Sequence, residues 1–286
     1  MEALVADLWQ AGQAAGLEGA RLWAALVTVS MLGGLVIYFG FGGLLYLRYY
    51  ILRRDDAATW KLQAKRFTPK KLHRWATSVA AGNLAIGGLL SGSYAYAISQ
   101  GGPTALYLDV GEYGWTYTIL STVIGFVLLE AAAYYTHRAL HGKWLFRHVH
   151  RWHHRVVAPT PFTTTTMHPA EFLSFQLTAF LPTFFVPLWA GSFIGLLVYV
   201  LIFNIMDHSG IEIHHSLPWQ SSSRYHDDHH VHFHCNYGQN LMFFDRFHGT
   251  LRRKDRRYGK DVFGGRGAPA AGETAPDGGD PFVDYS

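Results

Sequence analysis

Four long stretches of this chain carry almost no charge, and they limit it to folds whose helices lie in a membrane. Residues 22–47, 75–108 and 172–206 contain no Asp, Glu, Lys or Arg, and residues 115–136 contain only Glu130. A helix needs about 20 such residues to cross a bilayer. Charged residues make up 15% of the chain, whereas about a quarter is usual in soluble domains. The sequence therefore predicts an all-α integral membrane protein with about four transmembrane helices.

The last uncharged stretch has an unusual length. Its 35 residues exceed one crossing of about 20 residues and fall short of two. Pro182, Pro187 and Gly191 interrupt its middle, where they disfavour a continuous helix. We therefore expect a hairpin of two helices that enters and leaves the membrane on the same side.

The loop charges predict the orientation of the chain. Residues 48–74 hold nine Lys and Arg against two acids, whereas residues 100–114 hold no Lys or Arg and two acids. The positive-inside rule places the first loop in the cytosol and the second outside, so that residues 1–21 are non-cytosolic. The third span then ends in the cytosol just before His137, and the hairpin delivers His208 to the same side. A helical, histidine-rich cap on the cytosolic face is the predicted result.

Histidines occur in three clusters that reinforce this prediction. His137 and His141 form an HxxxH pattern, and two HxxHH patterns span His150–His154 and His226–His230; 16 of the 17 histidines lie between His137 and His248. A single histidine is usually solvated or hydrogen-bonded in a core, but residues i, i+3 and i+4 share one helix face. Neutral imidazole is the commonest protein ligand for iron, copper and zinc. Eight convergent imidazoles are too many for one four-coordinate zinc ion and suit two metals.

The ligand type narrows the chemistry. An all-imidazole site suits iron better than magnesium or calcium, which prefer oxygen ligands, and two irons beside a bilayer suggest oxygen activation against a C–H bond of a lipid. The single cysteine, Cys235, excludes an intramolecular disulfide, a cysteine-ligated iron–sulfur cluster and covalent c-type haem. Electrons must then come from outside. Five basic residues could dock an acidic electron donor, or could only hold their loops in the cytosol. They are Arg147, Arg151, Arg252, Arg253 and Lys254.

Further residues are candidates for the site. Glu130 is an ionisable group within a predicted span. It either acts near the metals or substrate, or forms a hydrogen bond that helps two helices to pack. His208, four residues after Asn204, is a candidate ninth ligand, and Asn236 is a second catalytic candidate beside Glu130. Partners that would orient the imidazoles are predicted among Asp207, Asp227, Asp228, His168 and His234. For Asp227 and Asp228, a solvated surface position is the alternative.

HxxxH, HxxHH and HxxHH, in this order on a helical membrane scaffold, resemble the fatty-acid hydroxylase/sterol desaturase superfamily over residues 115–250. Within it, the chain looks most like the sterol C-5 desaturase (lathosterol oxidase) branch. That closer resemblance lies in the segments Val157-Ala-Pro-Thr-Pro-Phe162, His168-Pro169, Asn236-Tyr237-Gly238-Gln239 and Asp245-Arg246.

The resemblance implies a membrane-bound, non-haem enzyme with two iron ions and O2 as cosubstrate. It also implies electrons from a b-type cytochrome or ferredoxin with its reductase. Carried over residue by residue, the implied iron ligands are His137, His141, His150, His153, His154, His208, His226, His229 and His230. Two departures are visible. Asn204 stands where some relatives have the first histidine of an HxxxH, and His248-Gly249-Thr250 looks more like the sterol C-4 methyl oxidase branch. Desaturation and hydroxylation therefore both remain open.

The function predicted is O2-dependent desaturation or hydroxylation of a lipid, first of all a sterol. A fatty-acyl chain, a carotenoid or a C-4 methyl sterol is an alternative substrate, and no nucleic-acid partner is expected. A zinc-dependent membrane hydrolase would normally carry an HExxH motif, which this sequence lacks. A metal-binding or transport protein would line a path across the bilayer with ligands, whereas these histidines gather on one side.

The predicted domain organisation has three parts. Residues 1–21 form an N-terminal segment, residues 22–260 form a membrane di-iron oxidase domain with its histidine core at 137–248, and residues 261–286 form a tail. The tail is rich in Gly, Ala, Pro and Asp, which is typical of disorder. The expected host is a bacterial inner membrane or the endoplasmic reticulum, with the site on the cytosolic side.

Overall fold

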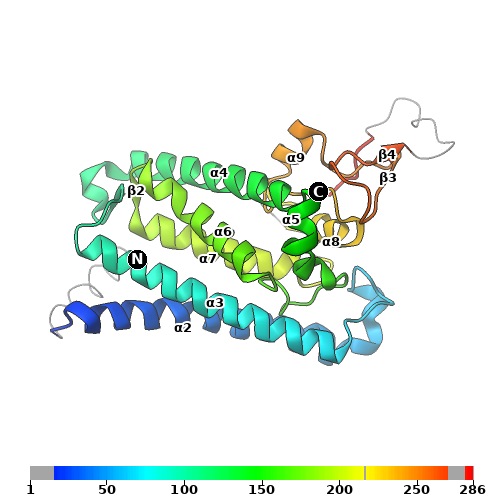
Figure 1. Ribbon diagram of the computed structural model, residues 1–286, viewed down its shortest axis with the longest axis horizontal. Coiled ribbons are helices and arrows are strands. Elements are labelled where there is room, and N and C mark those ends of the chain that lie inside the picture. The colour runs from blue at the N-terminus through cyan, green and yellow to red at the C-terminus, as the bar shows by residue number, and fades with distance from the viewer. Residues whose placement is uncertain (1–15, 216, 270–280, 286) are drawn as a thin grey trace.

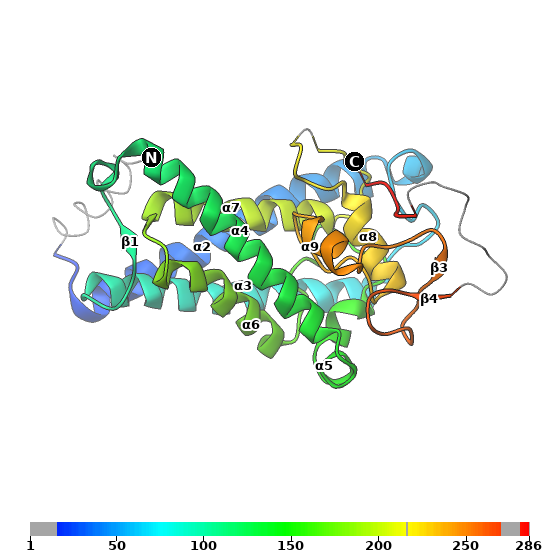
Figure 2. The same cartoon turned by 90° about the horizontal axis from the view of Figure 1, so that it is seen from above.

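The chain folds into a bundle of long helices with a cap of short helices at one end (Figure 1). The computed structural model describes residues 16–215, 217–269 and 281–285. In these residues, β-structure consists of two pairs of two-residue strands and two isolated bridges. The prediction of an all-α chain with a histidine-rich helical cap is confirmed. Figure 2 shows the cap and the described C-terminal residues at the same end of the molecule.

The elements run in the order α2 (Gly19–Leu45), η1 (Tyr46–Ile51), η2 (Arg54–Thr59), α3 (Lys70–Ser99), β1 (Leu106–Tyr107), η3 (Val110–Glu112), α4 (Gly114–Leu140), α5 (Lys143–His148), η4 (His150–Arg155), α6 (Pro169–Phe180), η5 (Leu181–Phe184), β2 (Leu188–Trp189), α7 (Ala190–Asp207), α8 (Ser223–His232), α9 (Phe243–His248), β3 (Arg256–Arg257) and β4 (Ala268–Pro269). Residues 1–15 of the predicted N-terminal segment lie outside the described residues.

Helices α2 and α3 form one tightly packed pair. A Cβ atom on Gly88 of α3 would lie 2.3 Å from the Cα of Met31, and one on Gly92 would lie 2.3 Å from the Cα of Val27. Any side chain at these positions would force the helices apart. Small residues four apart permit this backbone-to-backbone approach, as they do between helices in membranes.

Helices α6 and α7 lie between α4 and the α2–α3 pair, because α6 packs against α4 and α3 while α7 packs against α4 and α2 (Figure 1). At the end remote from the cap, β1 pairs with β2 in parallel, with Leu106 opposite Leu188 and Tyr107 opposite Trp189. This pairing fixes the loop before α4 to the start of α7. The last two turns of α4 then carry His137 toward the cap.

The stretch after His168 forms the expected hairpin. Helix α6 runs away from the cap, η5 and β2 turn the chain, and α7 returns it (Figures 1 and 2). Both ends lie beside the same segment, because the ring of His168 is 4.8 Å from that of Trp152 and His208 Nε2 is 3.2 Å from His153 Nε2. The break falls at Pro182, as the sequence predicted.

Three stretches are long and apolar enough to cross a membrane, namely Gly19–Ile51, Gly114–Leu140 and Ala190–Asp207. The outer face of α2 is apolar, with Val29, Val36 and Leu44 each 67% exposed, as contact with lipid requires. Helix α3 has 30 residues but is less apolar than these three. The count of four crossings therefore stays a prediction.

The C-terminal residues return to the cap. Residues 270–280 and 286 of the predicted disordered tail lie outside the described residues. Tyr285, however, is buried; its hydroxyl donates to Asp228 at 2.7 Å, and its carbonyl accepts from the amide of Ser222 at 2.9 Å. The buried ring and these hydrogen bonds hold Tyr285 against the cap and offset the entropy of ordering it.

Candidate metal centre

The structure brings all nine histidines of the predicted ligand set into two groups. Within each group, one ligand atom from every side chain lies within 4.8 Å of the others, and every member is buried. The first group, called here site A, contains His137, His141, His150, His154 and His229. The second, site B, contains His153, His208, His226 and His230.

The two sites do not correspond to the sequence clusters. The histidines of each motif were expected to share one helix face, but both HxxHH motifs divide between the sites. On α8, His226 and His230 serve site B while His229 serves site A. The reason is helical geometry: residues i and i+4 are about 40° apart around the axis, whereas i+3 lies about 60° away on the other side of residue i. One short helix can therefore contribute to two adjacent sites.

Backbone carbonyls orient several imidazoles from outside the two sites. Nδ1 of His137 donates to the carbonyl of Tyr237 at 2.7 Å, and Nδ1 of His229 donates to the carbonyl of Cys235 at 2.6 Å. Phe233, at the end of α8, adopts φ 67°, and this left-handed residue turns the chain back so that these carbonyls lie behind the rings. With the proton on Nδ1, each ring presents the lone pair of Nε2 to its site.

The same arrangement recurs at two site-B histidines. Nδ1 of His208 donates to the carbonyl of Asn204 at 2.8 Å, and Nδ1 of His153 donates to the carbonyl of Thr166 at 3.3 Å. Asn204 therefore contributes its backbone behind His208. Its side chain donates instead to the carbonyl of Val200 and to Gln239.

One imidazole is held by a carboxylate. Nδ1 of His150 lies 2.7 Å from Oε1 of Glu171, the third residue of α6, and both side chains are fully buried. Such carboxylate–imidazole pairs fix the ring and make its other nitrogen a stronger ligand. Oε2 of Glu171 has no hydrogen-bond partner among the described residues.

The inward nitrogens fit a cation in each site. Nε2 of His141, His229 and His230 is buried without a hydrogen-bond partner in the described residues. Other inward nitrogens face each other closely, at 3.1 Å between His150 and His154 and 2.8 Å between His208 and His226. Two nitrogens at about 2.1 Å from one metal ion are about 3 Å apart at a right angle, so this spacing suits ligation. The donor set of each site is imidazole nitrogen alone.

Burial keeps these imidazoles neutral. It lowers the pKa of His150, His154 and His230 well below the usual value, and neighbouring imidazoles lower it further. Burial also lowers the pKa of His208 to about 4. Neutral imidazole is the form that binds metal, so at neutral pH the rings need no deprotonation to act as ligands.

The metal-free protein should lose stability as the pH falls below about 6.5. An unfolded histidine takes up a proton near this pH, whereas the buried imidazoles of both sites take one up only at much lower pH. Each such ring then costs up to about 1.4 kcal/mol per pH unit until its folded pKa is reached. Thermal unfolding between pH 8 and pH 5 measures this effect. A midpoint that is level or rises toward pH 5 would contradict the assignment.

The two catalytic candidates of the sequence have partners other than the two sites. Both oxygens of Glu130 accept hydrogen bonds from the 240–241 loop, from the amides of Asn240 and Leu241 and the side chain of Asn240. Asn236 donates to the carbonyl of Tyr225 and to Tyr285 Oη, and accepts from the amide of Arg252. Glu130 therefore ties α4 to residues 240–241, and Asn236 ties α8 to Arg252.

The predicted aspartates also have other partners. Asp207 lies 3.6 Å from His215, Asp227 accepts from Gln63 at 3.0 Å, and Asp228 pairs with Arg252 at 2.9 Å. None of these contacts involves the nine histidines. These aspartates therefore do not orient the ligating rings through the contacts observed. Backbone carbonyls and Glu171 instead bond to Nδ1 of the rings.

Of the other two candidates, His234 contacts the site and His168 does not. Nε2 of His234 donates to the carbonyl of Lys260 at 2.9 Å, so its Nδ1 accepts from Nδ1 of His141 at 2.9 Å. This chain leaves Nε2 of His141 free to face site A. Nδ1 of His168 instead accepts from the amide of Ala170 and caps α6.

Glu171 was not among the residues predicted from the sequence. Glu171 directly precedes the uncharged stretch of residues 172–206, and an acid at the end of a candidate membrane helix was a usable signal. The carbonyls behind the other rings carried no signal, because every residue has one.

Comparison with known proteins agrees with this site. The fatty acid hydroxylase family matches residues 122–250, which include all nine histidines. Rat (Rattus norvegicus) lathosterol oxidase is 32% identical over 56% of this chain and 54% of its own length. A Delta(7)-sterol 5(6)-desaturase of Gibberella zeae is 30% identical over 53% of this chain and 47% of its own length.

A third relative aligns over more of the chain. The Delta(7)-sterol 5(6)-desaturase of Leptosphaeria maculans is 28% identical over 80% of this chain and 62% of its own length. The chain thus spans about half the length of the first two relatives, and no solved structure matches it. Residues 122–250 of this chain thus match the fatty acid hydroxylase family, and the chain is similar to lathosterol oxidase and to Delta(7)-sterol 5(6)-desaturases.

Proposed function

We propose that this protein is a membrane-bound oxidoreductase that uses O2 and two iron ions to desaturate a sterol. The observation that carries the proposal is the pair of adjacent, buried, all-imidazole sites at the end of a helical membrane bundle. The relatives named for lathosterol and Delta(7)-sterol chemistry favour the 5(6) bond of a Δ7-sterol as the target.

In this proposal the nine histidines hold one iron ion in each site. Iron bound there would supply the redox chemistry that activates O2. Glu171 holds the ring of His150, and His234 holds that of His141. Because all nine rings are buried, the protein excludes bulk water from the place where a strong oxidant would form. Site B uses four imidazoles and site A five, and neither contains the glutamate that a zinc hydrolase would need.

The overall reaction needs an external reductant. Removing one hydrogen from each of two neighbouring sterol carbons supplies two electrons and two protons. Reduction of O2 to two waters takes four electrons and four protons, so a carrier must deliver two electrons and the solvent two protons. His137 lies in the last turn of α4, and His208 directly follows α7. The histidine sites therefore lie at the ends of long helices, where a sterol would approach from the bilayer and a b-type cytochrome or ferredoxin from the cytosol. The proposed host is a bacterial inner membrane or the endoplasmic reticulum.

Metal content and product analysis test the proposal together. Full-length protein purified in detergent should contain about two irons per chain. Supplied with a Δ7-sterol, O2 and a reduced ferredoxin, it should form the Δ5,7-diene and consume one O2 per product. A hydroxylated sterol instead of the diene would support the hydroxylase alternative. One zinc per chain, or turnover without O2, would overturn the proposal.

A further inference from the structure

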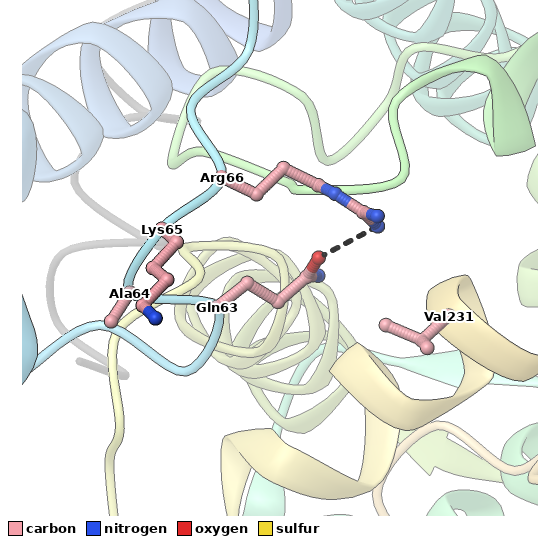
Figure 3. Close-up of a pocket in the computed structure, with 5 residues that line it drawn as sticks. All are labelled: Gln63, Ala64, Lys65, Arg66 and Val231. Atoms are coloured by element: carbon pink, nitrogen blue, oxygen red, sulfur yellow. Dashed lines mark hydrogen bonds between the residues drawn. The ribbon is translucent and has the colours of Figure 1, made fainter.

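Two shallow hollows lie side by side on the surface of the cap. The first, of about 390 Å³, is lined by Gln63, Ala64, Lys65, Arg66 and Val231 (Figure 3). The second, of about 290 Å³, shares Arg66 and also includes Arg155. We call the two together the basic hollow. Its lining contains three cationic side chains and no acid.

The charges of the basic hollow are unneutralised. Within the described part of the chain, neither Lys65, Arg66 nor Arg155 forms an ion pair: Arg66 bonds to the amide oxygen of Gln63 at 3.3 Å, and Arg155 lies over the ring of Trp75 at 4.5 Å. By contrast, Arg252 and Arg253 are paired with Asp228 and Asp255 at 2.9 and 2.6 Å. Of the basic residues that sequence alone suggested, Arg252 and Arg253 are thus neutralised, whereas Arg147, Arg151 and Lys254 are exposed and form no ion pair among the described residues.

The basic hollow adjoins both metal sites. Val231 follows His230 of site B in the chain, and Arg155 follows His154 of site A. Gln63 adds a hydrogen-bonded link, because its amide donates to Asp227 at 3.0 Å and to the carbonyl of Val157 at 2.7 Å. A residue of the basic hollow is therefore bonded directly, through one peptide bond, to a predicted ligand of each site.

We infer that the basic hollow docks an acidic protein that carries one electron at a time, an inference that rests on the proposed function. Two encounters supply two electrons: each carrier is oxidised by one electron, and iron held by the histidines of sites A and B would accept one electron in each site. A shallow, open surface suits the small, transient interfaces of electron-transfer partners. Complementary charge speeds such encounters. An anionic lipid headgroup would use the same charges but would not require a surface beside both sites.

Charge reversal at Arg66 tests the inference with a plant-type [2Fe–2S] ferredoxin as the probe. Arg66→Glu, and separately Lys65→Glu, should raise the Kd for oxidised ferredoxin about tenfold at low salt and weaken its salt dependence, as measured by surface plasmon resonance on the full chain. Arg66→Lys should retain binding. Arg257→Glu, an exposed arginine of β3 outside the hollow, is the matched control and should bind like wild type.

Electron delivery gives a second readout. In anaerobic stopped-flow mixing, ferric wild-type protein should oxidise two reduced ferredoxins per chain, and Arg66→Glu should slow this about tenfold. Reduction by the methyl viologen radical should proceed equally in both proteins. An equal loss in Arg257→Glu, or unchanged ferredoxin binding in Arg66→Glu, overturns the inference. The inference is also overturned if Arg66→Glu loses only the stabilisation that phosphatidylglycerol nanodiscs give to the wild-type protein. That result would identify a lipid as the ligand of the basic hollow. If wild type lacks iron and accepts no electron from viologen, the proposed function fails instead, and ferredoxin binding remains measurable.

Discussion

Replacing His229 with alanine should abolish turnover and remove metal from site A. His229 is fully buried, and its ring is held by the carbonyl of Cys235 so that Nε2 faces the other site-A rings. Alanine cannot supply a ligand, and the four remaining imidazoles cannot close the gap because their own rings are fixed by α4 and η4. We expect turnover below about 1% of wild type, since even loss of a group behind a ligand typically costs 10–100-fold. Bound iron and diene formation, measured on the same preparation, check this.

Two variants of the same helix serve as controls for His229. His232→Ala, at a half-buried residue outside both sites, should keep its iron and its activity. His230→Ala should remove metal from site B instead. Each variant should then retain about one iron, in site B for His229→Ala and in site A for His230→Ala. Full activity in His229→Ala, or equal loss in His232→Ala, would contradict the placement of the sites.

Replacing Glu171 with glutamine should weaken the metal centre while the fold persists. Burial raises the pKa of Glu171 well above its usual value, and a cation in site A would favour the charged carboxylate. Glutamine keeps the shape of the side chain but cannot carry that charge 2.7 Å from Nδ1 of His150. Loss of such a partner typically lowers metal affinity or activity by 10–100-fold. We therefore expect iron to be released at a lower chelator concentration, with turnover reduced by a similar factor even when iron is in excess.

A thermal comparison separates a positioning role of Glu171 from a structural one. The metal-free Glu171→Gln protein should unfold at or above the wild-type temperature, because a buried carboxyl with an unpartnered oxygen is replaced by a neutral amide. Glu212→Gln, at an exposed residue that pairs with Arg224, is the control and should retain metal affinity. Unchanged affinity in Glu171→Gln would show that His150 is positioned without this charge.

Much of the architecture was predictable because it depends on local composition. Uncharged stretches of helical length predict where the chain enters lipid, since an exposed peptide group is costly there. Prolines in the stretch of residues 172–206 predicted the turn at η5, because proline lacks the amide hydrogen that a helix requires. The nine histidines were predictable from their spacing and from the family resemblance. Helix α3 shows the limit: its uncharged sequence indicates a span, but its tight packing on α2 depends on a partner 60 residues away.

The division of the histidines into two sites was decided by tertiary structure. Sequence spacing shows which rings share a helix face, but it does not show which face another element approaches. His153 joins His208 because the hairpin returns α7 to η4, and His229 joins His137 because α8 packs across the end of α4.

The sequence by itself determined the membrane class, the supply of imidazole ligands and the hairpin that reunites them, because each depends on residue type and on local spacing. Only the tertiary structure decided what holds the rings and where a partner can approach. Glu171 meets His150, Tyr285 meets Asp228, and Val231 reaches the basic hollow across large separations in sequence. Such contacts depend on how whole helices pack, and helix packing is a collective property that no local pattern contains.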